Sequence, residues 1–315
     1  MTPSAALQSD VFCLYLFIII GTVCGAGILL AILALALKQN LKSLWPHYRS
    51  WLIMVVLGLA CVFVGRWATI LFFVVVAAQA FKEFAKATGL YRDWWYICAV
   101  YAGIIAVVVV CLVRDPVTGN PGWYDFFTGL PAYVVAALLI IPILRNRTEG
   151  QLQSIALSIV GFVYIGWMFG HLAFLANSRN AYGYLFYLVF AVEVNDAVDY
   201  YVGKFFGRHQ LCSKVNPAKT WEGALAALAV SMAMPWILMF SFPHFGALQL
   251  LMVGGIVGVG GQLGDLSLSV IKQDLGVKDM GALIPGHGGV LDRVTSLIYT
   301  APLFLHTARY FYGLY

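Results

Sequence analysis

Residues 12–37 read FCLYLFIIIGTVCGAGILLAILALAL, a run without a single charged side chain. As an α-helix this run would be about 39 Å long, which exceeds the roughly 30 Å hydrocarbon core of a bilayer. The rest of the chain has the same character, because 62% of its 315 residues are hydrophobic, only 10% are charged and the mean hydropathy is +0.86. Soluble domains carry roughly 25% charged residues. The composition therefore excludes a soluble enzyme, a disordered chain and a basic-patch nucleic-acid binder, and it predicts an all-α polytopic transmembrane protein.

Apolar segments of spanning or near-spanning length recur along the chain, so we expect about ten transmembrane helices, within a range of eight to ten. These segments fall at residues 12–37, 51–64, 67–81, 95–113, 130–144, 153–176, 181–200, 222–241, 248–271 and 296–313. Close helix packing is predicted where glycines recur at GxxxG spacing, at Gly21/Gly25, Gly254/Gly258 and Gly260/Gly264.

Basic residues are distributed unevenly between the two sets of loops that ten spans would create. If the N-terminus lies outside, 15 of the 19 Lys and Arg residues fall in inward loops, Lys38 and Lys42 among them. Cytoplasmic loops of membrane proteins carry such an excess. The charges therefore favour ten spans, an outside N-terminus and inward loops that face the cytoplasm. The net charge of +5 reflects this topology and does not imply a nucleic-acid partner.

Acidic residues gather in one part of the chain, since eight of the 14 lie between residues 193 and 292. They fall at the inward ends of predicted spans or in two inward segments. A carboxylate at the centre of a span costs roughly 2.5–3.5 kcal/mol, so such residues usually face an interior cavity and carry function. Asp196 and Asp265 are the foremost candidates. The alternative is a set of solvated residues at helix ends.

The first inward segment reads NDAVDYYVGKFFGRHQLCSKVNPAKTWEG at residues 195–223 and includes Lys204. We expect its NPAKT stretch to form a turn before a helix. Lys219, Thr220 and the free N–H groups of that helix could then hold a phosphate. The alternative is a basic loop that attracts anionic lipid headgroups, at about 1 kcal/mol per cation.

The second inward segment reads GDLSLSVIKQDLGVKDMGALIPGHGGVLDRVTS at residues 264–296. Asp265 and Asp292 supply hard oxygen ligands suited to Mg²⁺. Three cations, Lys272, Lys278 and Arg293, can neutralise phosphate charge. Between them lies a glycine-rich turn with His287, Gly288 and Gly289, which can point backbone N–H groups at an anion. The combination predicts phosphoryl chemistry at a membrane surface, with the role of His287 left open.

These two segments resemble the CDP-diacylglycerol synthase (phosphatidate cytidylyltransferase) family. Its C-terminal signature is matched here by Ser269, Lys272, Lys278, Asp279, Gly281, Pro285, His287, Gly288, Gly289, Asp292 and Arg293. Its upstream pattern is matched by Asp196, Tyr200, Gly203, Lys204, Gly207, Arg208, Pro217, Lys219, Thr220, Trp221, Glu222 and Gly223. A weaker likeness runs through AFKEFAKATG at residues 80–89. We therefore interpret residues 1–50 as an added N-terminal transmembrane helix with its loop, and residues 51–315 as a membrane cytidylyltransferase-like domain.

The resemblance implies an enzyme that transfers CMP from CTP to phosphatidate or a related lipid phosphate, giving CDP-diacylglycerol and pyrophosphate in phospholipid synthesis. The implied metal is Mg²⁺ on Asp265 and Asp292, with K⁺ as a second cation. The implied catalytic residues are Asp265, Asp292, Lys272, Arg293 and His287. The implied nucleotide-binding residues are Lys219, Thr220, Lys278, Gly288, Gly289, Asp196 and Lys204. We expect an integral protein of a bacterial inner membrane, surrounded by membrane lipids, with its active site facing the cytoplasm and with a homodimer as one assembly.

Five positions depart from the family pattern: Asp199 stands where the pattern has alanine, Asn216 where it has serine, Leu268 where it has glutamate, Gln273 where it has arginine and Thr295 where it has aspartate. Loss of an acid near the metal at Thr295 should weaken or change the metal unless Asp199 or Glu193 compensates. The departures imply a divergent member of the family. Two other functions stay open: a catalytically weak or inactive membrane scaffold that binds partners or lipids, and a secondary transporter. Transporter sites usually lie near the midplane between repeated halves, whereas the polar residues here gather at one predicted surface.

Overall fold

The computed structural model describes residues 1–35, 44–286 and 288–315, which fold mainly into helices. In chain order the elements are α1 (Pro3–Leu7), α2 (Asp10–Leu35), α3 (Leu44–Val64), α4 (Arg66–Ala87), η1 (Leu90–Arg92), α5 (Trp94–Leu112), α6 (Tyr124–Arg145), α7 (Gln151–Val160), η2 (Gly161–Met168), α8 (Phe169–Leu175), α9 (Ala181–Phe206), β1 (Gln210–Cys212), β2 (Asn216–Thr220), α10 (Trp221–Ile237), η3 (Met239–Ser241), α11 (Ala247–Leu275) and α12 (Leu291–Tyr312). The prediction of an all-α fold is confirmed.

Each predicted apolar segment overlaps a long helical stretch. Among the described residues, six stretches are long and apolar enough to cross a membrane: Asp10–Ile32, Arg66–Ala87, Trp94–Leu112, Tyr124–Arg145, Gln151–Leu175 and Ala247–Leu275. Tyr48–Val64 and Trp221–Ile237 are apolar but shorter. The remaining two, α9 and α12, carry several charged side chains. Transmembrane helices are thus present, while the number of spans stays a prediction.

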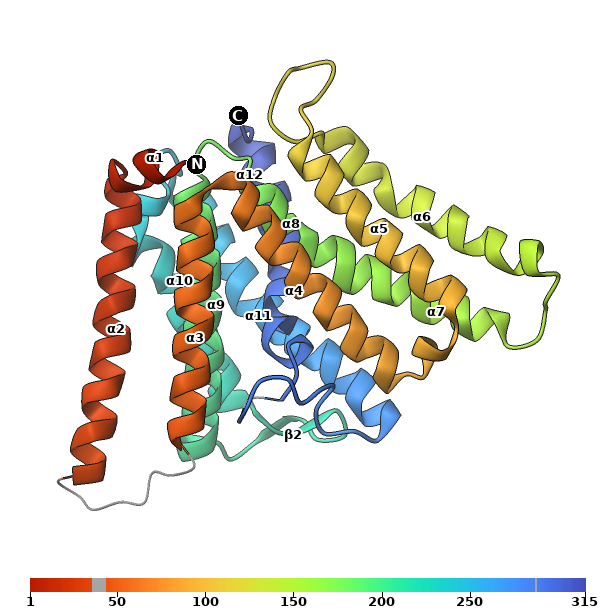
Figure 1. The fold of residues 1–315 in the computed structure, drawn as a ribbon. Helices are drawn as coiled ribbons and strands as arrows, with labels where there is room; N and C mark the ends of the chain where they lie inside the picture. Colours follow the sequence, from red (N-terminus) through yellow and green to blue (C-terminus); the bar gives the residue numbers. More distant parts are fainter. Residues whose placement is uncertain (36–43, 287) are drawn as a thin grey trace.

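The two ends of the helical bundle differ in what they carry. Figure 1 shows the N- and C-termini at one end, whereas β2, the C-terminal end of α11 and the segment leading into α12 lie at the other end. We call this second end the hairpin end. The two polar segments singled out from the sequence therefore meet at one end of the bundle, as predicted. Lys38 and Lys42, which entered the charge argument, lie outside the described residues.

Helix α11 packs very closely against its neighbours. A Cβ atom on Gly254 would lie 2.8 Å from the Met232 Cα of α10, and one on Gly264 would lie 2.5 Å from the Thr295 carbonyl oxygen of α12. Only glycine permits such contacts between backbones. The prediction of close packing is confirmed for α11. It is wrong for Gly21 and Gly25 of α2, since a Cβ atom on either would have no atom of a neighbouring element within 4 Å among the described residues.

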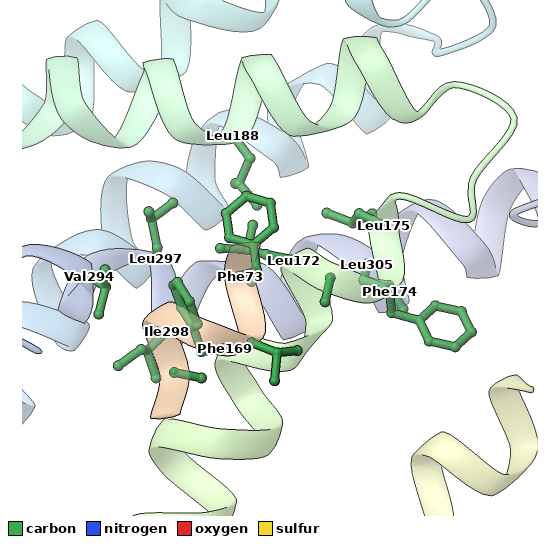
Figure 2. Packing of buried hydrophobic residues seen from close by; sticks show 14 of the residues in the cluster. Phe73, Phe169, Leu172, Phe174, Leu175, Leu188, Val294, Leu297, Ile298 and Leu305 are labelled. Carbon is green, nitrogen blue, oxygen red and sulfur yellow. The ribbon is translucent and has the colours of Figure 1, made fainter. Parts of the chain in front are cut away.

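The centre of the molecule is filled by side chains from four separate helices. Figure 2 shows Phe73 of α4, Phe169 of α8, Leu188 of α9 and Ile298 of α12 gathered in one cluster. The Phe73 and Phe169 rings meet edge to face with centroids 5.9 Å apart, an arrangement that adds about 0.5–1.5 kcal/mol beyond area burial. This packing supports the helices that carry the polar residues of the hairpin end.

The stretch at residues 151–175 is not a uniform helix, because its middle part, η2, is a π-helix. Such segments widen a helix and often occur near functional sites. The Tyr164 hydroxyl, in η2, lies 3.4 Å from the carbonyl oxygen of Gly264, to which it donates. This contact holds η2 against α11 one residue before Asp265.

The N-terminal helices pack against the rest of the chain. The hydroxyls of Tyr15 in α2 and Ser241 in η3 are hydrogen-bonded at 2.7 Å. The ring of Phe12 packs edge to face on Tyr182, with centroids 5.5 Å apart. The division of the chain at residue 50 stays a prediction.

Candidate functional site

A two-stranded hairpin forms one wall of the candidate site. The antiparallel pair of β1 and β2 brings Gln210 opposite Thr220. The expectation that NPAKT forms a turn is wrong, because these residues are strand β2. A proline disfavours helical geometry at the residue before it and so favours an extended Asn216. The strand leads directly into α10 and places Lys219 against α9 and α11.

Lys219 lies between two carboxylates from two different helices. Its Nζ is 2.9 Å from Asp265 Oδ2 in α11 and 3.3 Å from Asp199 Oδ2 in α9. Lys219 is 5% exposed, whereas the Asp265 side chain is 40% exposed. Burial lowers the pKa of Lys219, but Asp265 and Asp199 together outweigh burial, so its pKa lies above its ordinary value. The hairpin, α9 and α11 are thereby joined by one buried ammonium group.

The start of α10 is already capped by the protein itself. The Thr220 hydroxyl accepts a hydrogen bond from the Gly223 N–H at 3.2 Å, as an N-cap residue does. The N–H of Trp221 donates to the His209 carbonyl oxygen at 2.9 Å. Two of the N–H groups that we expected to be free for a phosphate are therefore engaged in this structure.

A second ion pair lies at the start of α12. Asp292 Oδ1 accepts from Lys272 Nζ at 3.1 Å, and the Asp292 side chain is 2% exposed. Its Oδ2 accepts from the backbone N–H groups of Met280 at 2.9 Å and Gly289 at 3.0 Å. Asp292 thus fixes both ends of the segment formed by residues 279–286 and 288–290, which we call the glycine loop.

The two predicted metal ligands are held by different lysines. Lys272 follows Asp265 by two turns of α11, a rise of about 10 Å along the helix axis. Within residues 1–35, 44–286 and 288–315, no three His, Cys, Asp or Glu side chains form a group that could hold a metal ion. The Mg²⁺ site stays a prediction.

The side chains fit a cation better at Asp265 than at Asp292. Asp265 is half exposed, and the neighbouring Asp199 Oδ1 is buried without a hydrogen-bond partner in the described part of the chain. Both are hard oxygen donors of the kind that Mg²⁺ prefers. Asp292 has both oxygens engaged, so it would need Lys272 to release Oδ1.

Asp196 joins α9 to α12 beside these pairs. Its Oδ2 accepts from the Ser296 hydroxyl at 2.9 Å, and its Oδ1 accepts from the Asn195 amide at 3.1 Å. The Asn195 amide oxygen in turn accepts from the Ser231 hydroxyl of α10 at 3.0 Å. Asp196 is therefore the exposed end of a polar chain through three packed helices.

The other predicted residues that the structure describes belong to the elements that meet at the hairpin end: the C-terminal part of α9, the segment after α11 and the start of α12. Lys204, Lys278 and Arg293 are exposed, and the Lys204 ammonium lies 5.5 Å from the centre of the Tyr200 ring. Gly288 has φ +80°, which favours glycine. His287 lies outside the described residues. The roles of all these residues stay predictions.

One residue of the site was missed from the sequence. Glu83 of α4 accepts from the Leu291 N–H at 2.9 Å, directly beside the glycine loop. The signal was present, because Glu83 is a carboxylate in a largely apolar helix. It lies in the AFKEFAKATG stretch, from which no role was assigned.

Comparison with known proteins gives concordant matches. Residues 46–311 match the profile described as "Cytidylyltransferase family". "Uncharacterized protein YnbB" of Escherichia coli (strain K12) is 28% identical over 298 residues, which cover 90% of this chain and 96% of that protein. "Phosphatidate cytidylyltransferase" of Staphylococcus haemolyticus is 35% identical over 160 residues, covering 50% of this chain and 60% of that protein. The protein of the same name from Staphylococcus aureus (strain COL) is 31% identical over 206 residues, covering 64% and 76%.

Proposed function

The chain belongs to the cytidylyltransferase family, and we propose that it transfers CMP from CTP to phosphatidate or a related lipid phosphate. It is a nucleotidyltransferase and an integral membrane protein. The proposal rests on where the charged residues and the glycine loop lie in the structure. Two lysine–aspartate pairs and the glycine loop lie together at one end of an apolar helical bundle. A water-soluble nucleotide and a lipid headgroup can both reach such a place.

The reaction requires little covalent help from the protein. An oxygen of the lipid phosphate attacks the α-phosphorus of CTP, one P–O bond forms, and the bond to pyrophosphate breaks. Catalysis of this kind depends on positioning the two phosphates and on neutralising charge as it moves to the leaving group. The basic residues of the hairpin end are suited to both tasks.

The lysines of the two ion pairs act by exchanging partners. Lys219 and Lys272 each donate to an aspartate in this structure. An incoming triphosphate competes for the same ammonium groups, and the aspartates so released become available to a cation. The exposed side chains of Lys278 and Arg293 reach phosphate without such an exchange. Charge-assisted hydrogen bonds of this type are about twice as strong as neutral ones.

A Mg²⁺ ion would be held by Asp265 and Asp292, with K⁺ as the proposed second cation. The bound ion would neutralise phosphate charge and favour loss of pyrophosphate. Asp199 Oδ1 has no hydrogen-bond partner among the described residues, which supports a cation beside Asp265. Asp199 thus becomes the carboxylate that compensates for Thr295.

The cellular placement follows from the charge distribution. The excess of Lys and Arg in one set of loops supports an orientation with the hairpin end facing the cytoplasm and the N-terminus outside, and the bacterial sources of the relatives support a bacterial inner membrane. CTP then arrives from the cytoplasm and the lipid arrives from the bilayer. The proposed assembly is a homodimer.

The test is a transfer assay on the purified protein in detergent, with radiolabelled CTP, phosphatidate and Mg²⁺. We expect a CDP-lipid product that disappears on chelation of Mg²⁺ and in Asp265→Asn and Asp292→Asn. Asp274→Asn, an exposed carboxylate at the end of α11, is the matched control and should keep its activity. Thermal stabilisation by CTP–Mg²⁺ without product from several lipid phosphates would favour a scaffold instead. Solute flux in proteoliposomes would favour a transporter.

A further inference from the structure

Glu83 is a buried carboxylate that the reaction described above does not use. It is 5% exposed, and its Oε1 has no hydrogen-bond partner among the described residues. A buried oxygen without a partner loses its hydration and gains no hydrogen bond in return, which is unfavourable. Such a group in a membrane helix calls for a functional explanation.

Glu83 accepts a hydrogen bond from the backbone N–H of Leu291, the first residue of α12. The N–H groups of a first helical turn have no partner within the helix, and an N-cap side chain usually accepts from one of them. The residue before α12 is Val290, which has no side-chain acceptor and makes no cap hydrogen bond. Glu83 supplies the missing acceptor from α4, 208 residues away, by accepting from the Leu291 N–H at 2.9 Å. The negative charge of Glu83 is also stabilising there, because the helix dipole makes the N-terminal end of α12 partly positive.

The glycine loop is shaped around the same carboxylate. A Cβ atom on Gly281 would lie 2.7 Å from Glu83 Oε1, and one on Gly289 would also collide with the Glu83 carboxylate. Gly289 simultaneously donates its N–H to Asp292 Oδ2. Glu83 and Asp292 therefore hold neighbouring parts of one loop, and any shift of Glu83 would be transmitted to the Asp292 side chain.

We propose that Glu83 is a positioning residue, which fixes the glycine loop and the first turn of α12 so that Asp292 and Lys272 keep their geometry. This inference rests on the proposed transferase function for its catalytic consequence. Glu83 does not touch the substrate in this scheme. It acts through the backbone at Leu291 and through its contacts with the two glycines.

The experiment compares Glu83→Gln and Glu83→Ala with Glu149→Gln, an exposed glutamate after α6. Glu83→Gln keeps an oxygen acceptor for Leu291 but loses the charge, whereas Glu83→Ala loses both. We expect kcat to fall by about 10- to 100-fold in the alanine variant and by less in the glutamine variant, with a smaller change in KM for CTP. The control should match the wild type.

Amide hydrogen exchange supplies the readout that a general loss of stability would not give. In both Glu83 variants, peptides containing Met280 or Leu291 should exchange faster, while peptides of α10 keep their wild-type rates. Unchanged exchange at these peptides, or an unchanged kcat per folded molecule in Glu83→Ala, would overturn the proposal. If the alanine variant does not fold, the near-isosteric glutamine variant decides. The exchange experiment needs no activity, so a wild type without transfer would refute the proposed function and leave the test of Glu83 intact.

Discussion

The bridge made by Lys219 between Asp199 and Asp265 gives a quantitative test of the site. We consider Lys219→Met, which retains the length of the side chain and removes its charge. Removing one partner of a buried ion pair costs about 3–5 kcal/mol, because the remaining charge is buried alone. Asp265 is 40% exposed and can regain water, whereas the Asp199 side chain is only 14% exposed. We therefore expect a loss near the lower limit, about 3 kcal/mol in the free energy of unfolding.

The second change, Asp199→Asn, removes the less hydrated of the two negative charges. Lys219 keeps Asp265 at 2.9 Å and asparagine keeps an oxygen acceptor, so this change alone should cost about 1 kcal/mol, the net contribution of one hydrogen bond. In the double variant the lone Asp199 charge that destabilises Lys219→Met is absent. The double variant should then be more stable than the sum of the two single losses predicts, by about 1–2 kcal/mol.

Unfolding in mixed detergent micelles, followed by tryptophan fluorescence, measures the four free energies. Lys219→Met combined with Asp125→Asn is the control, since Asp125 is an exposed residue in the first turn of α6. The losses of unfolding free energy caused by Lys219→Met and Asp125→Asn should add. The raised pKa of Lys219 means that the stabilisation is fully present below about pH 10 and is lost only as the pH rises through the folded-state value, so pH 7.5 is suitable. Additivity of Lys219→Met and Asp199→Asn within about 0.5 kcal/mol would refute the bridge as an energetic unit.

Three further predictions concern other parts of the structure. Gly289→Ala places a methyl group against the Glu83 carboxylate and the backbone nitrogen of Gly281, so we expect at least about a tenfold loss of transfer; wild-type transfer in the activity assay would argue against these contacts. Burial lowers the pKa of His244, so the unfolded state binds more protons below about pH 6.5. Thermal stability should therefore fall from pH 7.5 to pH 5.5, less steeply in His244→Gln, and parallel melting curves for the two proteins would contradict this. His306→Leu removes the partner of the Tyr124 hydroxyl, 2.8 Å away, and should cost about 1–3 kcal/mol in detergent unfolding, whereas a loss below about 0.5 kcal/mol would show that the hydroxyl finds another partner.

Hydropathy was sufficient to predict the helices. A long, continuous apolar run in a membrane must pair its backbone N–H and C=O groups internally, and an α-helix does so within one segment. Hydropathy was insufficient for the hairpin, where the extended preference before Pro217 and pairing with Gln210–Cys212 produced a strand instead of a turn. The glycines of α2 show the same limit. Their spacing permits a close contact, but only the position of a neighbouring helix decides whether one forms.

The site was predictable in its residue types and unpredictable in its partners. Asp292 was proposed as a metal ligand from its chemistry, yet in this structure it accepts from Lys272 and from two backbone N–H groups. Those contacts depend on how the glycine loop folds back on α12. The role of Glu83 depends on a contact across 208 positions of the chain, which no local pattern encodes.

Burial and charge partners in the structure account for three of the positions that depart from the family pattern. Leu268 and Thr295, where the pattern has acids, are 2% and 4% exposed, and the Thr295 carbonyl oxygen lies against the backbone of Gly264. A carboxylate at either position would be buried, and at position 295 it would also lie in a tight helix contact; an unpaired buried charge is costly. Asp199, where the pattern has alanine, instead lies beside a buried lysine that can balance it. The chain thus has uncharged side chains at these two buried positions and a carboxylate where Lys219 balances it, so Asp199 of α9 and Asp265 of α11 together face Lys219 of the hairpin.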